Sequence, residues 1–162
     1  LSGCSQKIVA EPSLVEEFKA KKEQAGENEV FIYIIRVNHM LGAAISHGIG
    51  CNDQSYSLSS GTYALCKSNK EINTVSITQK QYPFLYEKID VKYGETIFLY
   101  DDFGFGRHTL KTIDNDLGMT MVMDAQEKGL LYEDEYTEKS ILKYDFNCAG
   151  NEVSLDADKE NV

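Results

Sequence analysis

Histidine is a frequent general base and metal ligand, and it occurs three times, as His39, His47 and His108. Two metal ligands on one helix or strand usually stand at positions i and i+4 or i and i+2. No two of these histidines have either spacing. We therefore expect surface or half-buried histidines and no metal site.

Three other patterns could carry chemistry, but each lacks a required part. Residues 104–108, Gly-Phe-Gly-Arg-His, lack the Gly-Lys-Ser/Thr and the helix of a phosphate loop. Residues 114–118, Asp-Asn-Asp-Leu-Gly, place glycine one position early for an EF-hand, and residues 156–158 lack the remaining calcium ligands. No serine stands in a Gly-x-Ser-x-Gly elbow. We predict no catalytic residue, no cofactor and no enzymatic activity.

The segment Leu1-Ser2-Gly3-Cys4 could undergo a covalent modification, because small residues before a cysteine let its thiol reach a lipid transferase. The segment resembles the lipobox of bacterial lipoproteins, Leu-(Ala/Ser)-(Gly/Ala)-Cys. This resemblance implies acylation of Cys4, with the first three residues as the end of a signal segment. The alternative is a chance match in an ordinary chain. Ser5 resembles the residue that follows the cysteine in lipoproteins sorted to the outer membrane, so we expect a lipid-anchored protein of the bacterial cell envelope that faces the periplasm or the cell surface.

The other cysteines are Cys51, Cys66 and Cys148, an odd number. No two cysteines have the C-x-x-C spacing of a redox motif or a zinc knuckle. In an oxidising compartment, one disulfide and one free thiol are the simplest outcome. A bond between Cys51 and Cys66 would close a loop of about 16 residues and contribute roughly 3 kcal/mol. We take this pair as the prediction and keep Cys66–Cys148 as the alternative.

Composition limits the possible partners. The chain has 162 residues, of which 42% are hydrophobic and 26% charged, as in an ordinary globular domain. Its net charge of −10 argues against nucleic-acid binding and against adsorption to anionic lipid. No apolar run approaches the roughly 18–20 residues of a membrane-spanning helix. We expect attachment to the membrane through acyl chains at Cys4.

The hydrophobic pattern predicts a mainly β fold. After a tether, Ser13 and Glu16 form a capping-box pattern that predicts a short helix ending at Gly26. From Glu29 onward, short strands alternate with turns about every 8–12 residues, as in an antiparallel sandwich or barrel. The predicted strands are 30–35, 43–49, 54–58, 62–66, 72–78, 84–91, 95–100, 107–113, 119–123 and 141–146.

Residues 114–118 are predicted to form a loop. Asp124 and Glu127 form a second capping-box pattern, which predicts a short helical segment through about Tyr132. The predicted organisation is a lipobox at 1–4, a tether and helix at 5–28, a β-sandwich at 29–147 and an acidic, flexible tail at 148–162.

Five segments occur in an order that resembles a known family. They are Phe-Ile-Tyr-Ile-Ile-Arg at 31–36, Leu-Ser-Ser-Gly-Thr-Tyr at 58–63, Asn-Thr-Val-Ser-Ile at 73–77, Gly-Glu-Thr-Ile-Phe-Leu at 94–99 and Met-Val-Met-Asp-Ala-Gln-Glu-Lys-Gly at 121–129. The order is similar to that of the domain-of-unknown-function 2846 family of bacterial lipoproteins. The likeness covers roughly Glu29 to Leu131 and departs from the family at residues 68–71, where the family has a Pro-Gly turn. It implies an immunoglobulin-like β-sandwich and carries over no catalytic residue.

Ten tyrosines and no tryptophan favour a binding role, because a tyrosine ring covers area while its hydroxyl stays in water. The candidate contact residues are Tyr82, Tyr86, Tyr93 and Tyr100. The alternative is that most of these tyrosines are half-buried on sheet faces.

Two functions follow from the sequence. The first is a binding or scaffold module that contacts an envelope protein, peptidoglycan or a host surface. The alternative is a periplasmic carrier of a small apolar ligand, with a cavity lined by tyrosine, phenylalanine and the methionines Met119, Met121 and Met123.

Overall fold

The strand Val30–Arg36 (β1) is apolar along almost its whole length, and all seven of its residues are buried. In this computed structural model, which describes residues 9–36, 46–79, 82–104 and 107–125, β1 lies inside a four-stranded sheet. Tyr33 and Ile35 face a core shared with two helices, whereas Ile32 and Ile34 face a core shared with a second sheet. The strand is apolar on both faces because both faces are covered.

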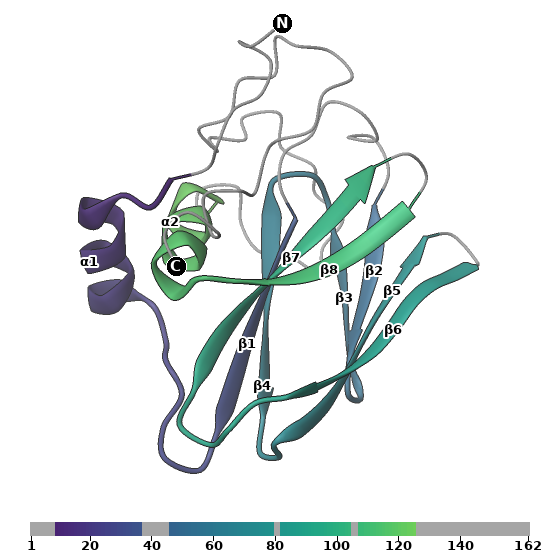
Figure 1. The fold of residues 1–162 in the computed structure, drawn as a ribbon, viewed down its shortest axis with the longest axis horizontal. Helices are drawn as coiled ribbons and strands as arrows, with labels where there is room; N and C mark the ends of the chain where they lie inside the picture. Colours follow the sequence, from purple (N-terminus) through teal and green to yellow (C-terminus); the bar gives the residue numbers. More distant parts are fainter. Residues whose placement is uncertain (1–8, 37–45, 80–81, 105–106, 126–162) are drawn as a thin grey trace, which may run out of the picture.

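The two sheets and the two helices form three layers, with the helices on one side and the second sheet on the other (Figure 1). The first sheet has the order β4-β1-β7-β8 and contains β4 (Thr62–Ser68), β7 (Thr96–Gly104) and β8 (Arg107–Ile113) beside β1. The second sheet has the order β3-β2-β5-β6 and contains β2 (His47–Cys51), β3 (Gln54–Leu58), β5 (Ile72–Gln79) and β6 (Tyr82–Asp90).

The predicted β-sandwich with a short helix near each end of the described chain is confirmed. One pairing differs from the antiparallel expectation, because β1 and β7 run parallel, with Phe31 opposite Thr96 and Arg36 opposite Asp101. Parallel neighbours need a long connection rather than a hairpin. The chain provides it by leaving the first sheet after β4 and forming β5 and β6 before it returns as β7.

The helix Pro12–Lys21 (α1) begins one residue before the predicted cap. Proline occupies its first turn, where no backbone N–H is needed, and Glu11 stands at the N-cap without a side-chain cap hydrogen bond. The predicted Ser13 cap is therefore wrong. Val15 and Phe18 are buried in the core, and the Phe18 ring lies 5.3 Å from the Tyr33 ring, centroid to centroid. The helix is thus part of the folded domain.

The helix Asn115–Ala125 (α2) corrects a prediction. Residues 114–118 were expected to form a loop and residues 119–123 a strand, but residues 115–125 form one continuous helix. Asp114 starts it, because its Oδ2 accepts a hydrogen bond of 3.1 Å from the backbone N–H of Asp116. Leucine and methionine favour a helix, and α2 is buried from Leu117 onward, so the polar–apolar alternation typical of a half-buried strand is not required. The acidic residues that have a calcium-loop pattern therefore form the start of a helix.

Asp124, which the sequence predicted at the start of a second short helix, lies within α2 near its end. The predicted helical continuation to Tyr132, the strand 141–146 and the tail 148–162 lie outside the described residues.

Gly118 lets α2 approach β7 closely. A Cβ atom at this position would overlap the buried ring of Phe98. We expect Gly118→Ala to destabilise the domain by about 1–3 kcal/mol, because overpacking outweighs the gain of about 1 kcal/mol in helix propensity. Chemical denaturation measures this loss, and a double variant with Phe98→Leu should recover part of it. A neutral or stabilising Gly118→Ala would contradict the contact between α2 and β7.

Candidate functional site

A disulfide links the two sheets. It joins Cys51 at the end of β2 to Cys66 in β4, with the two Cα atoms 6.3 Å apart, and both residues are fully buried. This is the pairing taken as the prediction from the sequence. Cys4 and Cys148 lie outside the described residues. The bond fixes the end of β2 in the second sheet against β4 of the first sheet.

Beside the disulfide lies a wide, open depression of about 820 Å³, which we call the polar groove. Its volume falls in the range of roughly 300–1,000 Å³ found for ligand sites. Its lining comes from the β2–β3 turn, from the end of β4 and the turn after it, from the outer face of β5 and β6, and from the start of β1. The lining residues are Glu29, Asn52, Asp53, Gln54, Lys67, Ser68, Asn69, Lys70, Thr74, Ser76 and Tyr86.

Asn52 holds one wall of the polar groove in place. It follows Cys51 directly and has a φ of 55°, in the left-handed region that asparagine tolerates. Its side-chain amide donates to Asn73 Oδ1 at 2.9 Å, and its Oδ1 accepts from the backbone N–H of Thr74 at 3.1 Å. The disulfide and these hydrogen bonds together fix the β2–β3 turn to β5.

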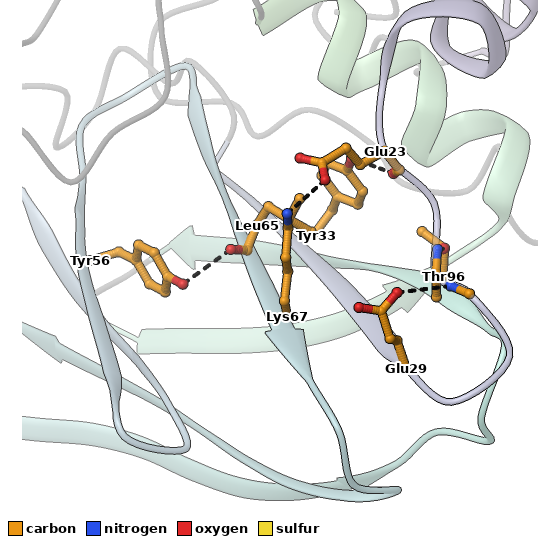
Figure 2. Close-up of polar contacts among 9 residues, drawn as sticks. Glu23, Glu29, Tyr33, Tyr56, Leu65, Lys67 and Thr96 are labelled. Atoms are coloured by element: carbon orange, nitrogen blue, oxygen red, sulfur yellow. Dashed lines mark hydrogen bonds and ion pairs between the residues drawn. The ribbon is translucent and has the colours of Figure 1, made fainter.

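The opposite wall is the edge strand β4, and side chains from β3 bind its outward carbonyls. Gln54 donates to the carbonyl of Lys67 at 2.9 Å. The Tyr56 hydroxyl lies 3.0 Å from the carbonyl of Leu65, as Figure 2 shows, and 2.6 Å from Gln54 Oε1, so its proton is shared between two acceptors. These contacts occupy two of the carbonyls through which an exposed edge would pair with another strand.

A second group of polar contacts fastens the segment between α1 and β1 to the first sheet (Figure 2). The buried Tyr33 hydroxyl donates to the backbone carbonyl of Glu23 at 2.7 Å. Burial raises the pKa of Tyr33 well above its usual value, with smaller contributions from Tyr63 and Glu23, so the hydroxyl keeps its proton. Lys67 pairs with the Glu23 carboxylate at 2.6 Å, but this exposed ion pair contributes little stability.

The same segment is fastened at its far end. The backbone N–H of Ala25 donates to Thr96 Oγ1 at 2.9 Å, and that of Gly26 donates to Glu29 Oε2 at 3.1 Å. Two charged residues at the rim of the polar groove, Glu29 and Lys67, therefore have defined positions.

The floor of the polar groove carries polar groups that the fold does not use. Within the described part of the chain, the side chains of Thr74, Ser76 and Tyr86 form no hydrogen bond or ion pair, and the Tyr86 side chain is 66% exposed. Gly50 lies beside them on β2, and a Cβ atom there would be 2.5 Å from Ser76 Oγ. The neighbouring strand thus leaves Ser76 open to the groove.

The structure separates the four predicted contact tyrosines. Tyr86 lines the polar groove, and Tyr93 is 47% exposed after β6, with its hydroxyl donating to the carbonyl of Asn69 at 3.0 Å. Tyr100 is only 1% exposed, so its assignment to a contact surface is wrong: β7 lies between β1 and β8, and its ring packs in the core under the helices. Tyr82 lies in β6, but its side chain is outside the described ones.

One histidine is more buried than predicted. His47 and Asp101 are both fully buried, and His47 Nδ1 lies 2.7 Å from Asp101 Oδ2, which links β2 to β7 between the sheets. His39 and the side chain of His108 lie outside the part of the chain that the structure describes. Among the residues that the structure describes, no three histidine, cysteine or acidic side chains form a group that could hold a metal ion.

Comparison with known proteins gives no match: no family model, curated protein or solved structure is significantly similar to this chain. The resemblance to a lipoprotein family stays a prediction. The features of the molecule that bear on function are the disulfide and the polar groove.

Removal of the disulfide should weaken the domain and loosen the groove. We expect the double variant Cys51→Ala/Cys66→Ala to lose about 3 kcal/mol of unfolding free energy, as for a loop of this size. Chemical denaturation measures the loss, and Cys148→Ala serves as the control that should leave stability unchanged. A non-reducing digest should contain the Cys51–Cys66 cross-linked peptide, whereas a Cys66–Cys148 peptide would refute the pairing.

Proposed function

We propose that the protein is a lipid-anchored binding module of the bacterial cell envelope, acylated at Cys4, and that the polar groove is its binding surface. The observation that carries the binding role is the groove itself. Its walls are fixed by a disulfide and by hydrogen bonds, while Thr74, Ser76 and Tyr86 on its floor have no side-chain partner among the residues that the structure describes. A site whose walls are already ordered loses little conformational entropy when it binds a ligand.

The disulfide also supports the envelope location. A buried structural disulfide is rare in reducing compartments and common in periplasmic and cell-surface proteins. The lipobox residues Leu1 to Cys4 give the means of attachment, because acyl chains contribute about 0.8 kcal/mol per buried CH₂ group. In the described residues, neither helix has the length and apolar character needed to cross a bilayer. The acidic chain would need acyl chains rather than a basic patch to stay at an anionic surface.

The described structure favours the groove over an apolar carrier cavity. The carrier hypothesis placed Met119, Met121 and Met123 around a ligand. In α2 these three side chains are buried in the core with residues of α1 and the first sheet. Met121 and Met123 contribute to the folded core, and Met119 borders only a small open depression of about 290 Å³ that it shares with polar residues such as Glu95 and Thr96.

Acylation has a direct test. In cells given an alkyne analogue of palmitate, the full-length precursor should incorporate the label and sediment with membranes. Cys4→Ala should abolish both, because no other residue carries the lipobox pattern, whereas Cys148→Ala should leave both unchanged. Equal labelling of the wild type and of Cys4→Ala would refute the lipid anchor.

The binding role of the polar groove has a separate test. The Cys4→Ala chain, which is free of lipid, should co-sediment with purified envelope fragments. Thr74→Arg should lower this affinity at least about tenfold, because it places a long charged side chain on the groove floor. The matched control is Thr112→Arg, at an exposed position of β8 outside the groove lining, and it should bind like the parent chain. Equal binding by all three proteins would refute the groove as the binding surface.

A further inference from the structure

Tyr86 differs from the other polar-groove residues because it presents an aromatic ring among hydroxyl groups. It lies on β6 directly opposite Ser76 of β5, and Thr74 lies two residues further along β5 on the same face. The three side chains form no hydrogen bond or ion pair within the described part of the chain. An exposed ring beside hydroxyl groups can stack on the C–H face of a sugar while neighbouring hydroxyls bond to the sugar hydroxyls.

We propose that the polar groove binds an uncharged oligosaccharide, with one sugar ring stacked on Tyr86. This proposal rests on the binding role of the groove and names its ligand. The exposed side chains of Asn69 and Asp53 stand at the rim, where an amide and a carboxylate add donors and acceptors for further hydroxyls. A volume of about 820 Å³ accommodates more than a single sugar unit.

Charge favours a neutral ligand. The four charged residues of the groove are Glu29, Asp53, Lys67 and Lys70, so their formal charges cancel. Lys67 is already paired with a carboxylate outside the lining. A phosphate-rich or uronate-rich polymer would meet no excess of positive charge here, and the net charge of −10 would repel it.

The walls of the polar groove are poorly suited to bind a peptide strand or a lipid chain. A peptide that extends a sheet needs free carbonyls and N–H groups on the edge strand. On β4 the carbonyls of Leu65 and Lys67 already accept hydrogen bonds from side chains of β3. A lipid chain needs an apolar lining, but among the described exposed large hydrophobic residues only Tyr86 borders the groove.

The test is titration calorimetry of the full chain carrying Cys4→Ala with cellohexaose, chitohexaose and maltohexaose. We expect at least one of these uncharged probes to bind. Tyr86→Ala should lower its affinity at least about tenfold, whereas Tyr86→Phe should stay within about twofold, because stacking uses the ring and not the hydroxyl. The matched control is Ile72→Ala, an equally exposed residue of β5 outside the groove lining, which should bind like the parent.

Absence of binding by all three oligosaccharides, or equal binding by Tyr86→Ala, would overturn the proposal. The co-sedimentation test distinguishes this failure from failure of the groove itself. If Thr74→Arg lowers envelope binding and protease treatment of the envelope abolishes it, the groove binds a protein and the sugar assignment is wrong. If Thr74→Arg has no effect either, both proposals fail.

Discussion

The structure depends on one strand that is covered on both faces. β1 contributes Tyr33 and Ile35 to the core beneath the helices, and Ile32 and Ile34 to the core between the sheets. Both faces of such a strand must be covered by other elements. Two sheets alone would cover only one face, so the domain needs the helices as a third layer. The aromatic contact between Phe18 and Tyr33 shows how α1 meets this requirement. The helix of the segment predicted as a tether and short helix is thereby required for the domain to bury its central strand.

The strands were predictable because their pattern is local, whereas the last helix and the groove were not. The methionines of α2 alternate with other residues, as apolar residues do in a strand. The helix is favoured by the burial of these side chains against α1 and the first sheet and by the Asp114 cap. Strand periodicity likewise cannot tell Tyr86 on edge strand β6 from Tyr100 on inner strand β7, because edge position depends on sheet order. The polar groove joins turns and strands distant along the chain, and the sequence indicated it only through the cysteines that flank it and through Tyr86, one of the predicted contact residues.

The disulfide has two consequences that should be kept apart. Its first consequence is thermodynamic, because it restricts the unfolded chain and so raises stability. Its second is positional, because Asn52 and Lys67, the residues that follow the two cysteines, both line the polar groove. A reduced chain could retain most of its hydrophobic core and still lose the fixed spacing of these walls. The geometry of the polar groove is therefore more sensitive to reduction of the disulfide than the overall fold is.

The shortest inner strand, β2, is linked to the other sheet at both of its ends. β2 has five residues, His-Gly-Ile-Gly-Cys, and its two glycines give it low strand propensity and little side-chain packing. Its first residue is linked to the other sheet by the hydrogen bond between His47 and Asp101, and its last by the bond between Cys51 and Cys66. Between the two links, the side chain of Ile49 is buried in the core between the sheets. Of the two glycines, Gly50 lies beside Ser76, where any larger side chain would overlap the Ser76 hydroxyl. The same residue that lowers the strand propensity of β2 therefore keeps the floor of the polar groove open.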